Sequence, residues 1–194
     1  MRFFHIPLVA VLLFAAGCSN NKLSESSAAT QSQAVMEPVK SKLNEEGTKM
    51  LVDIVTNYYT LKNAMTATNA ADATNAAAKL AAATDTLQSF LQKDSLNSAM
   101  SKPYLDTIII QSLLTASFND PSCEKQRIVF GTISSAMYGL LKKTEIRNAK
   151  IYHEMCPMAF NDKGATWLSS ESDIKNPYFG KKMLECGEVT DTLN

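Results

Sequence analysis

Apolar residues recur at helical spacing from about Leu43 to Lys143. Residues three and four positions apart share one face of an α-helix, so this spacing predicts helices that each bury one side. Four such faces follow one another, with capping and turn-forming residues between them. The pattern is incompatible with a β-sandwich and predicts a mainly helical fold.

The four expected faces share a spacing of three or four residues between large or small apolar side chains. They are Leu51, Ile54, Val55, Tyr58, Leu61 and Met65; Ala76, Leu80, Ala83, Leu87 and Leu91; Leu105, Ile109, Leu113, Leu114 and Phe118; and Val129, Ile133, Ala136, Met137, Leu140 and Leu141. We expect the third helix to begin near Pro103. Asp120 and Pro121 suit the cap and first position of the fourth helix. Four such helices with short connections predict an antiparallel up-and-down bundle.

The pattern changes after Lys143, where turn formers such as Gly164, Asn176-Pro177 and Gly187 become frequent. We expect a small, loop-rich C-terminal module at about 149–190, with two or three short strands and one helical turn. It should pack on the bundle through aromatic side chains, namely Phe160, Trp167, Tyr178 and Phe179. The fold class is therefore mainly α, and residues 43–194 are expected to form a single domain.

The N-terminal residues 1–17 are predicted to be a lipoprotein signal peptide. Arg2 precedes an apolar run from Ile6 to Ala16, which is about half as long as a membrane-spanning helix needs. The ending Ala15-Ala16-Gly17-Cys18 resembles a bacterial lipobox, although Ala15 stands where that pattern usually has Leu. Cys18 would then carry the lipid. The alternative is an ordinary secretory signal with an incidental cysteine.

Residues 18–42 are rich in Ser, Asn, Gln and Ala, and they contain few large apolar side chains. Such a segment buries too little surface to offset the entropy of ordering it, so we expect a flexible tether. Together with a lipid on Cys18, it would place the protein in the cell envelope, on the periplasmic or surface face of the outer membrane.

Charge and motif content exclude several functions. The formal net charge is +0, without a basic stripe, which argues against nucleic-acid binding. The sequence contains no Gly-rich phosphate loop, no His-Glu-x-x-His and no nucleophile elbow. His5 lies in the signal peptide, which leaves His153 as a lone histidine without a visible partner. We therefore do not expect an enzyme.

The C-terminal module concentrates sulfur. Cys156 and Met158 are two residues apart, which places them on one side of an extended segment, and Met183 and Cys186 are three apart, which suits one face of a helical turn. If these pairs meet, two thiolates and two thioethers converge, with His153 and Met155 nearby as further donors. Soft donors of this kind select Cu(I) or Ag(I), whereas zinc would more often take four Cys and His ligands.

The alternative for the same cysteines is a Cys156–Cys186 disulfide in an oxidising compartment. Closing a loop of about thirty residues would contribute about 3–4 kcal/mol in the chain-entropy model. The two states could interconvert, which would make metal loading dependent on redox state. Cys123 is the odd thiol. A position in the first helical turn would lower its pKa, and burial would leave it inert.

The segment CPMAFNDKGATWLSSESDIKNPYFGKKMLECGEV resembles the signature of an uncharacterised bacterial domain family. Upstream, NYYTLKNAM resembles the family's first helix and EKQRIVFGTISSAMYGLLK its last, so the likeness spans about residues 50–193. Cys123 does not belong to this pattern. Members of the family occur as small lipoproteins and fused to periplasmic adaptor subunits of copper/silver efflux systems.

Two functional hypotheses follow. In the first, a membrane-tethered lipoprotein binds Cu(I) or Ag(I) through Cys156, Met158, Met183 and Cys186, and supports metal homeostasis or efflux. The partner that the resemblance implies is a metal-efflux adaptor or another envelope protein. In the second, the protein is a structural or interaction lipoprotein, and Cys156 and Cys186 only form a stabilising disulfide.

Overall fold

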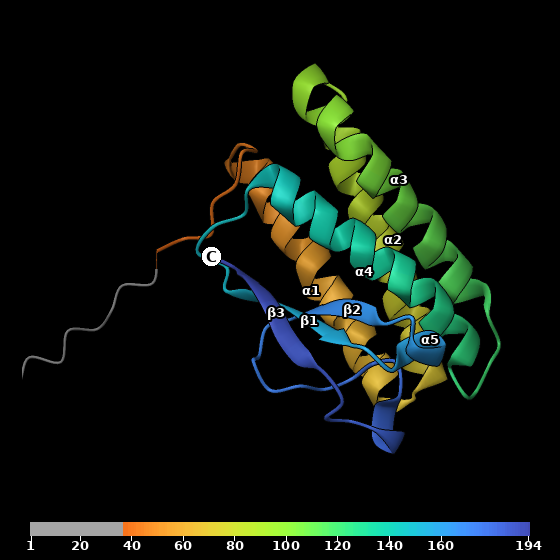
Figure 1. Ribbon diagram of the computed structural model, residues 1–194. Coiled ribbons are helices and arrows are strands. Elements are labelled where there is room, and N and C mark those ends of the chain that lie inside the picture. Colours follow the sequence, from red (N-terminus) through yellow and green to blue (C-terminus); the bar gives the residue numbers. More distant parts are fainter. Residues whose placement is uncertain (1–36) are drawn as a thin grey trace, which may run out of the picture. The chain divides into compact units, whose positions relative to one another are not determined.

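A computed structural model describes residues 37–194 (Figure 1). Four long helices follow one another: α1 (Glu45–Ala67), α2 (Ala70–Leu91), α3 (Ser95–Ser117) and α4 (Glu124–Thr144). Each helix packs on the next in antiparallel order, and a small C-terminal sheet completes the fold. The predicted fold class is confirmed.

Local capping sets the starts of the first three helices. The Oδ1 atoms of Asn44, Asn69 and Asp94 accept hydrogen bonds from the backbone N–H groups three residues on, at 2.8, 3.1 and 3.1 Å. These bonds satisfy amides that have no partner within the helix. The short connections between α1, α2 and α3 therefore contain little beyond a cap and a turn.

The inward faces predicted for α1, α2 and α4 are essentially confirmed. All six predicted residues of α1 are buried; the exceptions elsewhere are Ala83 and Val129, which are half-buried. Tyr58 and Phe130 stack at the centre, with ring centroids 5.4 Å apart, and the Tyr58 hydroxyl lies 2.7 Å from Ser134 Oγ. This contact joins α1 to α4 across the core.

The face predicted for α3 is wrong. Leu105 is buried as expected, but Leu113 and Leu114 are exposed, and α3 turns Ile108 and small polar residues inward instead. The buried polar residues are Ser101, Ser112 and Thr115. Small residues there suit close packing against the alanine-rich α2, which buries Ala73, Ala76 and Ala77.

Two predicted helix starts are also corrected. Pro103 lies inside α3, which begins at Ser95 because Asp94 supplies the cap. Asp120 does not cap α4 directly, since a turn intervenes and Cys123 holds the cap position with a φ of 60°. Asp120 Oδ2 still accepts from Lys125 N–H at 3.0 Å, so its side chain supports the first turn from farther away.

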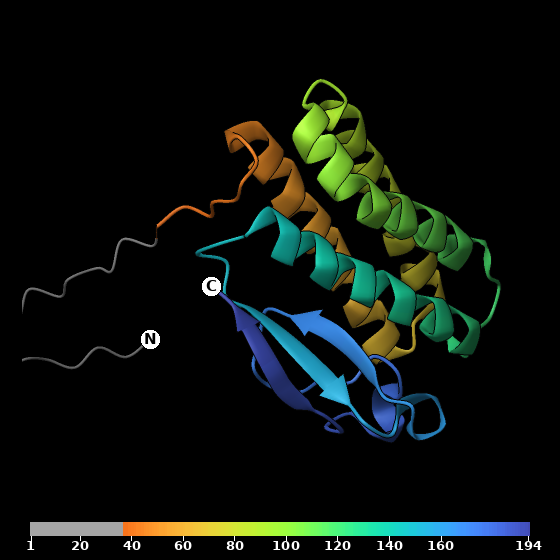
Figure 2. The same ribbon diagram turned by 45° about the horizontal axis from the view of Figure 1, so that its top comes forward.

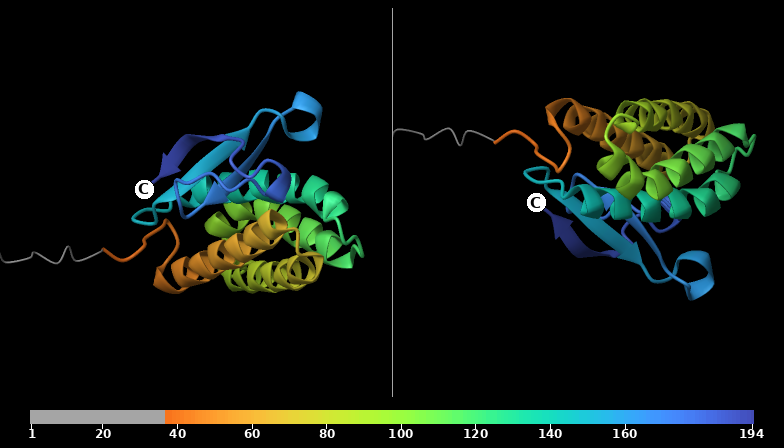
Figure 3. Two further views of the ribbon diagram at one scale, coloured as in Figure 1. Left: turned by 90° about the horizontal axis from the view of Figure 1, so that it is seen from below. Right: turned by 90° about the horizontal axis from the view of Figure 1, so that it is seen from above.

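The C-terminal module contains β1 (Ile151–Cys156), α5 (Ala159–Asp162), β2 (Ala165–Ser169), η1 (Gly180–Lys182) and β3 (Glu188–Leu193). The strands form an antiparallel sheet in the order β2-β1-β3, with Glu154 opposite Trp167 and with a bulge in the β1–β3 pairing between His153 and Glu154. The sheet covers α4 and α1 and leaves α2 and α3 uncovered (Figures 2 and 3).

Aromatic side chains join the module to the bundle, as predicted. Tyr178 lies 5.8 Å from Phe130, 5.2 Å from Phe160 and 5.9 Å from Trp167, measured between ring centroids. Such pairs add to the free energy gained from burying the rings. Phe179, the fourth predicted residue, is half-buried against the same core.

The folded body begins earlier than the expected end of the tether. Lys40 and Arg147 exchange two backbone hydrogen bonds, and Lys42 N–H donates to Thr144 O at 2.7 Å. Residues 37–42 therefore belong to the body. The signal peptide, Cys18 and the rest of the tether lie outside the described residues. Within residues 37–194, no helix is long and apolar enough to cross a membrane.

Candidate functional site

The end of β1 and the loop before β3 meet at a disulfide. Cys156 and Cys186 are bridged, with Cα atoms 5.8 Å apart and a sequence separation of 30. Cys156 is completely buried and Cys186 is half-buried. The sequence predicted this proximity under both hypotheses, and the disulfide is the observed state.

Asn176 holds the loop that carries Cys186. Its Nδ2 donates to Cys186 O at 2.7 Å, and its Oδ1 accepts from the backbone N–H groups of Tyr178 and Phe179 at 2.7 and 3.1 Å. The side chain is fully buried, and these bonds satisfy its amide in the core. The sequence indicated a turn at Asn176, but it did not indicate the hydrogen bond from Asn176 Nδ2 to Cys186 O.

Met158 and Met183 line the same open groove, and neither Cys156 nor Cys186 is among its lining residues. The groove has a volume of about 680 Å³ and lies between the start of α4 and the module. Its walls are mainly apolar and aromatic, and include Ile128, Phe160 and Phe179. Met158 is among the exposed large apolar side chains of the protein. The two thioether side chains that the sequence singled out therefore reach one solvent-accessible space.

The groove is bordered by an unusual backbone conformation. Phe160, Asn161 and Asp162 have φ angles of 55°, 57° and 62°, which makes the connection between β1 and β2 a left-handed turn. This conformation costs about 1–2 kcal/mol per residue, and a bulky side chain such as Phe seldom adopts it. Strain of this kind concentrates at functional sites, where surrounding structure enforces it. No sequence pattern marks Phe160 as a residue with this conformation.

Arg127 closes the inner end of the groove. Its guanidinium donates to Pro177 O, Ser122 O, Met65 O and Thr68 Oγ1 at 2.6–2.9 Å. The side chain thereby connects the end of α1, the start of α4 and the module. Burial lowers its pKa. Sequence reasoning missed Arg127, because nothing in the amphipathic pattern of α4 marks it as buried.

His153 does not reach the sulfur cluster. Its ring stacks on Tyr138 with centroids 4.0 Å apart, and Nδ1 lies 2.9 Å from Thr190 Oγ1. Thr190 Oγ1 also lies within hydrogen-bond distance of His153 O, at 3.0 Å. Cys156 lies three residues farther along the strand, or about 10 Å. Burial lowers the pKa of His153.

The remaining sulfur residues lie elsewhere. Met155 alternates with Cys156 along β1, so its side chain points to the other side of the strand. Cys123 is fully buried, and burial raises the pKa of its thiol. Cys123 holds the cap position of α4, and its burial agrees with the second of the two predicted alternatives. Between residues 37 and 194, no three His, Cys, Asp or Glu side chains gather as a metal site.

A buried carboxyl lies two residues before Cys156. Glu154 is completely buried, and no hydrogen bond of good geometry reaches either carboxyl oxygen, although Trp167 Nε1–H on the opposite strand lies near enough to act against the rise in the carboxyl's pKa. Desolvation raises the pKa of Glu154 to about 7, and the charge of buried Lys62 on α1 opposes this rise. Burial in turn lowers the pKa of Lys62. The alternation of residues along β1 could not have revealed that Glu154 and Lys62 are buried near each other.

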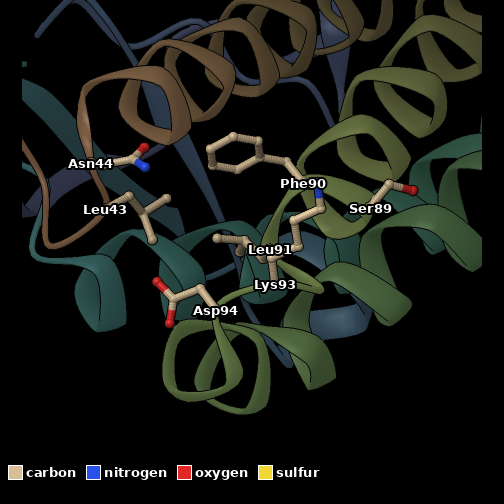
Figure 4. Close-up of a pocket in the computed structure, with 7 residues that line it drawn as sticks. All are labelled: Leu43, Asn44, Ser89, Phe90, Leu91, Lys93 and Asp94. Carbon is tan, nitrogen blue, oxygen red and sulfur yellow. The ribbon is translucent and has the colours of Figure 1, made fainter.

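A second cavity, of about 410 Å³, lies at the far end of the bundle (Figure 4). Leu43, Asn44 and Phe90 border it, between the start of α1 and the end of α2. It contains no sulfur ligand and no histidine. The groove lined by Met158 and Met183 is therefore the stronger candidate site.

Comparison with known protein families gives a match to a family without an assigned function. No curated protein and no solved structure matches the chain. The C-terminal cysteines and the groove-lining methionines lie beyond the part of the chain that a family model covers. Residues 54–149, from within α1 to just before β1, match the family described as Protein of unknown function (DUF3347).

Proposed function

We propose that the protein is a membrane-tethered lipoprotein of the cell envelope that binds Cu(I) or Ag(I) and supports metal homeostasis or efflux. The observation that carries this proposal is the position of Met158 and Met183. Both line one open groove, and they lie two and three residues along the chain from Cys156 and Cys186, which are close enough to bridge. Two thiolates and two thioethers form a soft donor set, which favours monovalent copper or silver.

Metal binding requires the reduced form. A dithiol reductant would supply two electrons and two protons to the Cys156–Cys186 bond, which gives two thiols and a cyclic disulfide of the reductant. The thiols then bind the ion as thiolates and release their protons. Loading of the site would thus depend on redox state, and the metal-efflux adaptor suggested by the family resemblance is the proposed recipient.

Because Cys156 is fully buried, a metal ion cannot reach its sulfur directly from solvent. The groove gives an ion a path to the thioethers of Met158 and Met183, and Cys186 is half-buried. An ion arriving from solvent would therefore meet the methionines first and Cys156 last. Thioethers on an open wall and thiols behind them suit a site that takes up an ion and passes it on.

The disulfide itself favours the second candidate function. It fastens the end of β1 to the loop before β3, in a module whose core is a small aromatic cluster. In this alternative the protein is a structural or interaction lipoprotein, and the methionines contribute only apolar surface to the groove.

Competition for Cu(I) against a chromogenic chelator distinguishes the two functions. With reduced protein, we expect Met158→Leu with Met183→Leu to weaken binding at least tenfold, while stability changes little because Leu conserves the volume. Met155→Leu is the matched control and should bind like the wild type, because Met155 faces away from the cluster. Unchanged affinity in the double variant, or no binding by the reduced wild type, would leave the structural function.

A further inference from the structure

Helix α3 turns its large apolar side chains outward. Ile110, Leu113 and Leu114 are 60%, 55% and 41% exposed, whereas Ser101 and Ser112 are fully buried and their hydroxyls have no hydrogen-bond partner. Burying an aliphatic side chain stabilises a fold, and an unpaired buried hydroxyl destabilises it. In this orientation the monomer therefore loses stability on both sides of α3, and a surface that covered the outer face would recover the part that the exposed apolar side chains lose.

The outer face of α3 has the spacing of a helix that packs on another helix. Residues at alternating intervals of four and three lie on this side, and none of them is buried: Leu96, Met100, Pro103, Thr107, Ile110, Leu114 and Ser117. Alternation of this kind marks the seam between two packed helices. The sheet covers α4 and α1 on the other side of the bundle, so the outer face of α3 is left uncovered (Figure 2).

The charge pattern indicates what covers this face. From Thr107 to Phe118 the helix carries no charged side chain, so a fitting surface must also be uncharged. Just before this stretch, Lys102 and Asp106 neutralise each other in an ion pair at 2.8 Å. The net charge of the whole chain is zero, so two copies do not repel each other at a distance.

We propose that the outer face of α3 pairs with the same face of a second copy of this chain, in antiparallel orientation about a two-fold axis near Ser112. A two-fold axis brings a patch against itself, and this apolar, uncharged patch is complementary to itself. Ile110 of one copy would meet Leu114 of the other, and Thr107 would meet Ser117.

The size of the patch predicts a weak dimer. The exposed parts of Ile110, Leu113 and Leu114 amount to roughly 300 Å², compared with roughly 800 Å² per partner in a stable interface. We therefore expect a dissociation constant in the micromolar range, with monomer and dimer in rapid exchange.

Sedimentation equilibrium of the full chain tests the pairing. The wild type should change from monomer to dimer between about 1 and 200 µM. Ile110→Ser with Leu114→Ser should remove the dimer. The control, Leu184→Ser with Val189→Ser, removes two exposed apolar side chains from the module and should dimerise like the wild type. Thermal unfolding of the α3 variant should match the wild type at monomer concentrations, since both positions are exposed.

Site-directed cross-linking tests the orientation. Two Leu113→Cys thiols would lie close to the axis and should be joined by a short bismaleimide, whereas two Leu96→Cys thiols would lie roughly 45–50 Å apart in an antiparallel pair and should not. Cys123 is buried and does not compete, and both variants carry Cys18→Ser so that no other thiol reacts. A monomer at every concentration, a dimer that survives the α3 substitutions, or equal cross-linking at both positions would overturn the proposal.

Discussion

Replacing Glu154 with Gln should stabilise the protein at alkaline pH. The pKa of Glu154 is raised from 4.5 to about 7 by burial, and one pKa unit corresponds to about 1.4 kcal/mol. Ionising this carboxyl inside the folded protein therefore costs up to about 3 kcal/mol. Gln has the shape of the protonated acid but cannot ionise, so the variant avoids this cost.

The sign of the pH dependence follows from where the proton is bound. Between pH 4.5 and about 7 the folded protein holds the Glu154 proton and the unfolded chain has lost it, so the contribution of Glu154 to stability falls as pH rises. Below pH 4.5 both states are protonated, and above about pH 7 both are ionised. We expect wild type and Glu154→Gln to be equally stable near pH 4, and the variant to be more stable by up to about 3 kcal/mol at pH 8.

The measurement is urea unfolding of both proteins from pH 4 to pH 8.5, with the disulfide intact. Glu171→Gln is the control, because Glu171 is exposed and its pKa is lowered by Lys175, so its removal gives no gain at high pH. Lys62→Met should move the wild-type loss of stability to higher pH, since Lys62 opposes the rise in the Glu154 pKa. Parallel stability curves for wild type and Glu154→Gln would refute the reasoning.

Three further changes test the packing. Arg127→Met should destabilise the protein by more than about 3 kcal/mol in urea unfolding, since four acceptors lose their donor, and Arg127→Lys should recover only part of this. Gly139→Ala should cost about 1–3 kcal/mol, because the new Cβ would lie 2.8 Å from Tyr104 Cδ1, and the added cost should disappear in a Tyr104→Ala background. Cys156→Ala with Cys186→Ala should cost about 3–4 kcal/mol for a separation of 30 residues, measured by thermal or urea unfolding; no loss would show that the bridge is not needed for stability.

The helical spacing predicted most of the bundle, because in α1 and α4 it allows only one apolar face. Leu51 to Met65 and Ile133 to Leu141 face the core as the spacing required. In α3 the sequence allowed two faces, since Ile108, Ile109 and Ile110 are consecutive and Leu113 and Leu114 are adjacent. The structure buries the face with small residues, and spacing along one helix contains no information about the neighbours against which it packs.

The sulfur residues of the candidate site could be predicted from the sequence, but the buried residues around them, and the turn at Phe160, could not. Cys156 and Cys186 were identifiable because the two cysteines and their methionines occur in one loop-rich segment. Arg127 and Glu154 owe their roles to burial between elements that are distant in sequence, so no local pattern distinguished them from surface charges. The left-handed turn at Phe160 likewise depends on contacts with Tyr178 and α4.

The hydrogen bonds of Asn176 help to decide whether the two thiols and two thioethers would stay together after the Cys156–Cys186 disulfide is reduced. If the disulfide alone held Cys186 in place, reduced protein would lose the arrangement that metal binding requires. Asn176 Nδ2 binds Cys186 O, Asn176 N–H donates to Leu184 O at 2.7 Å, and Cys186 N–H donates to Met183 O at 3.2 Å. None of these bonds involves sulfur, so the loop should remain beside β1 after reduction, with both thiols and both thioethers still near the groove. Pre-organisation of this kind lowers the ordering cost of binding, and it makes the same loop suitable both as a disulfide-bonded resting form and as a reduced metal site.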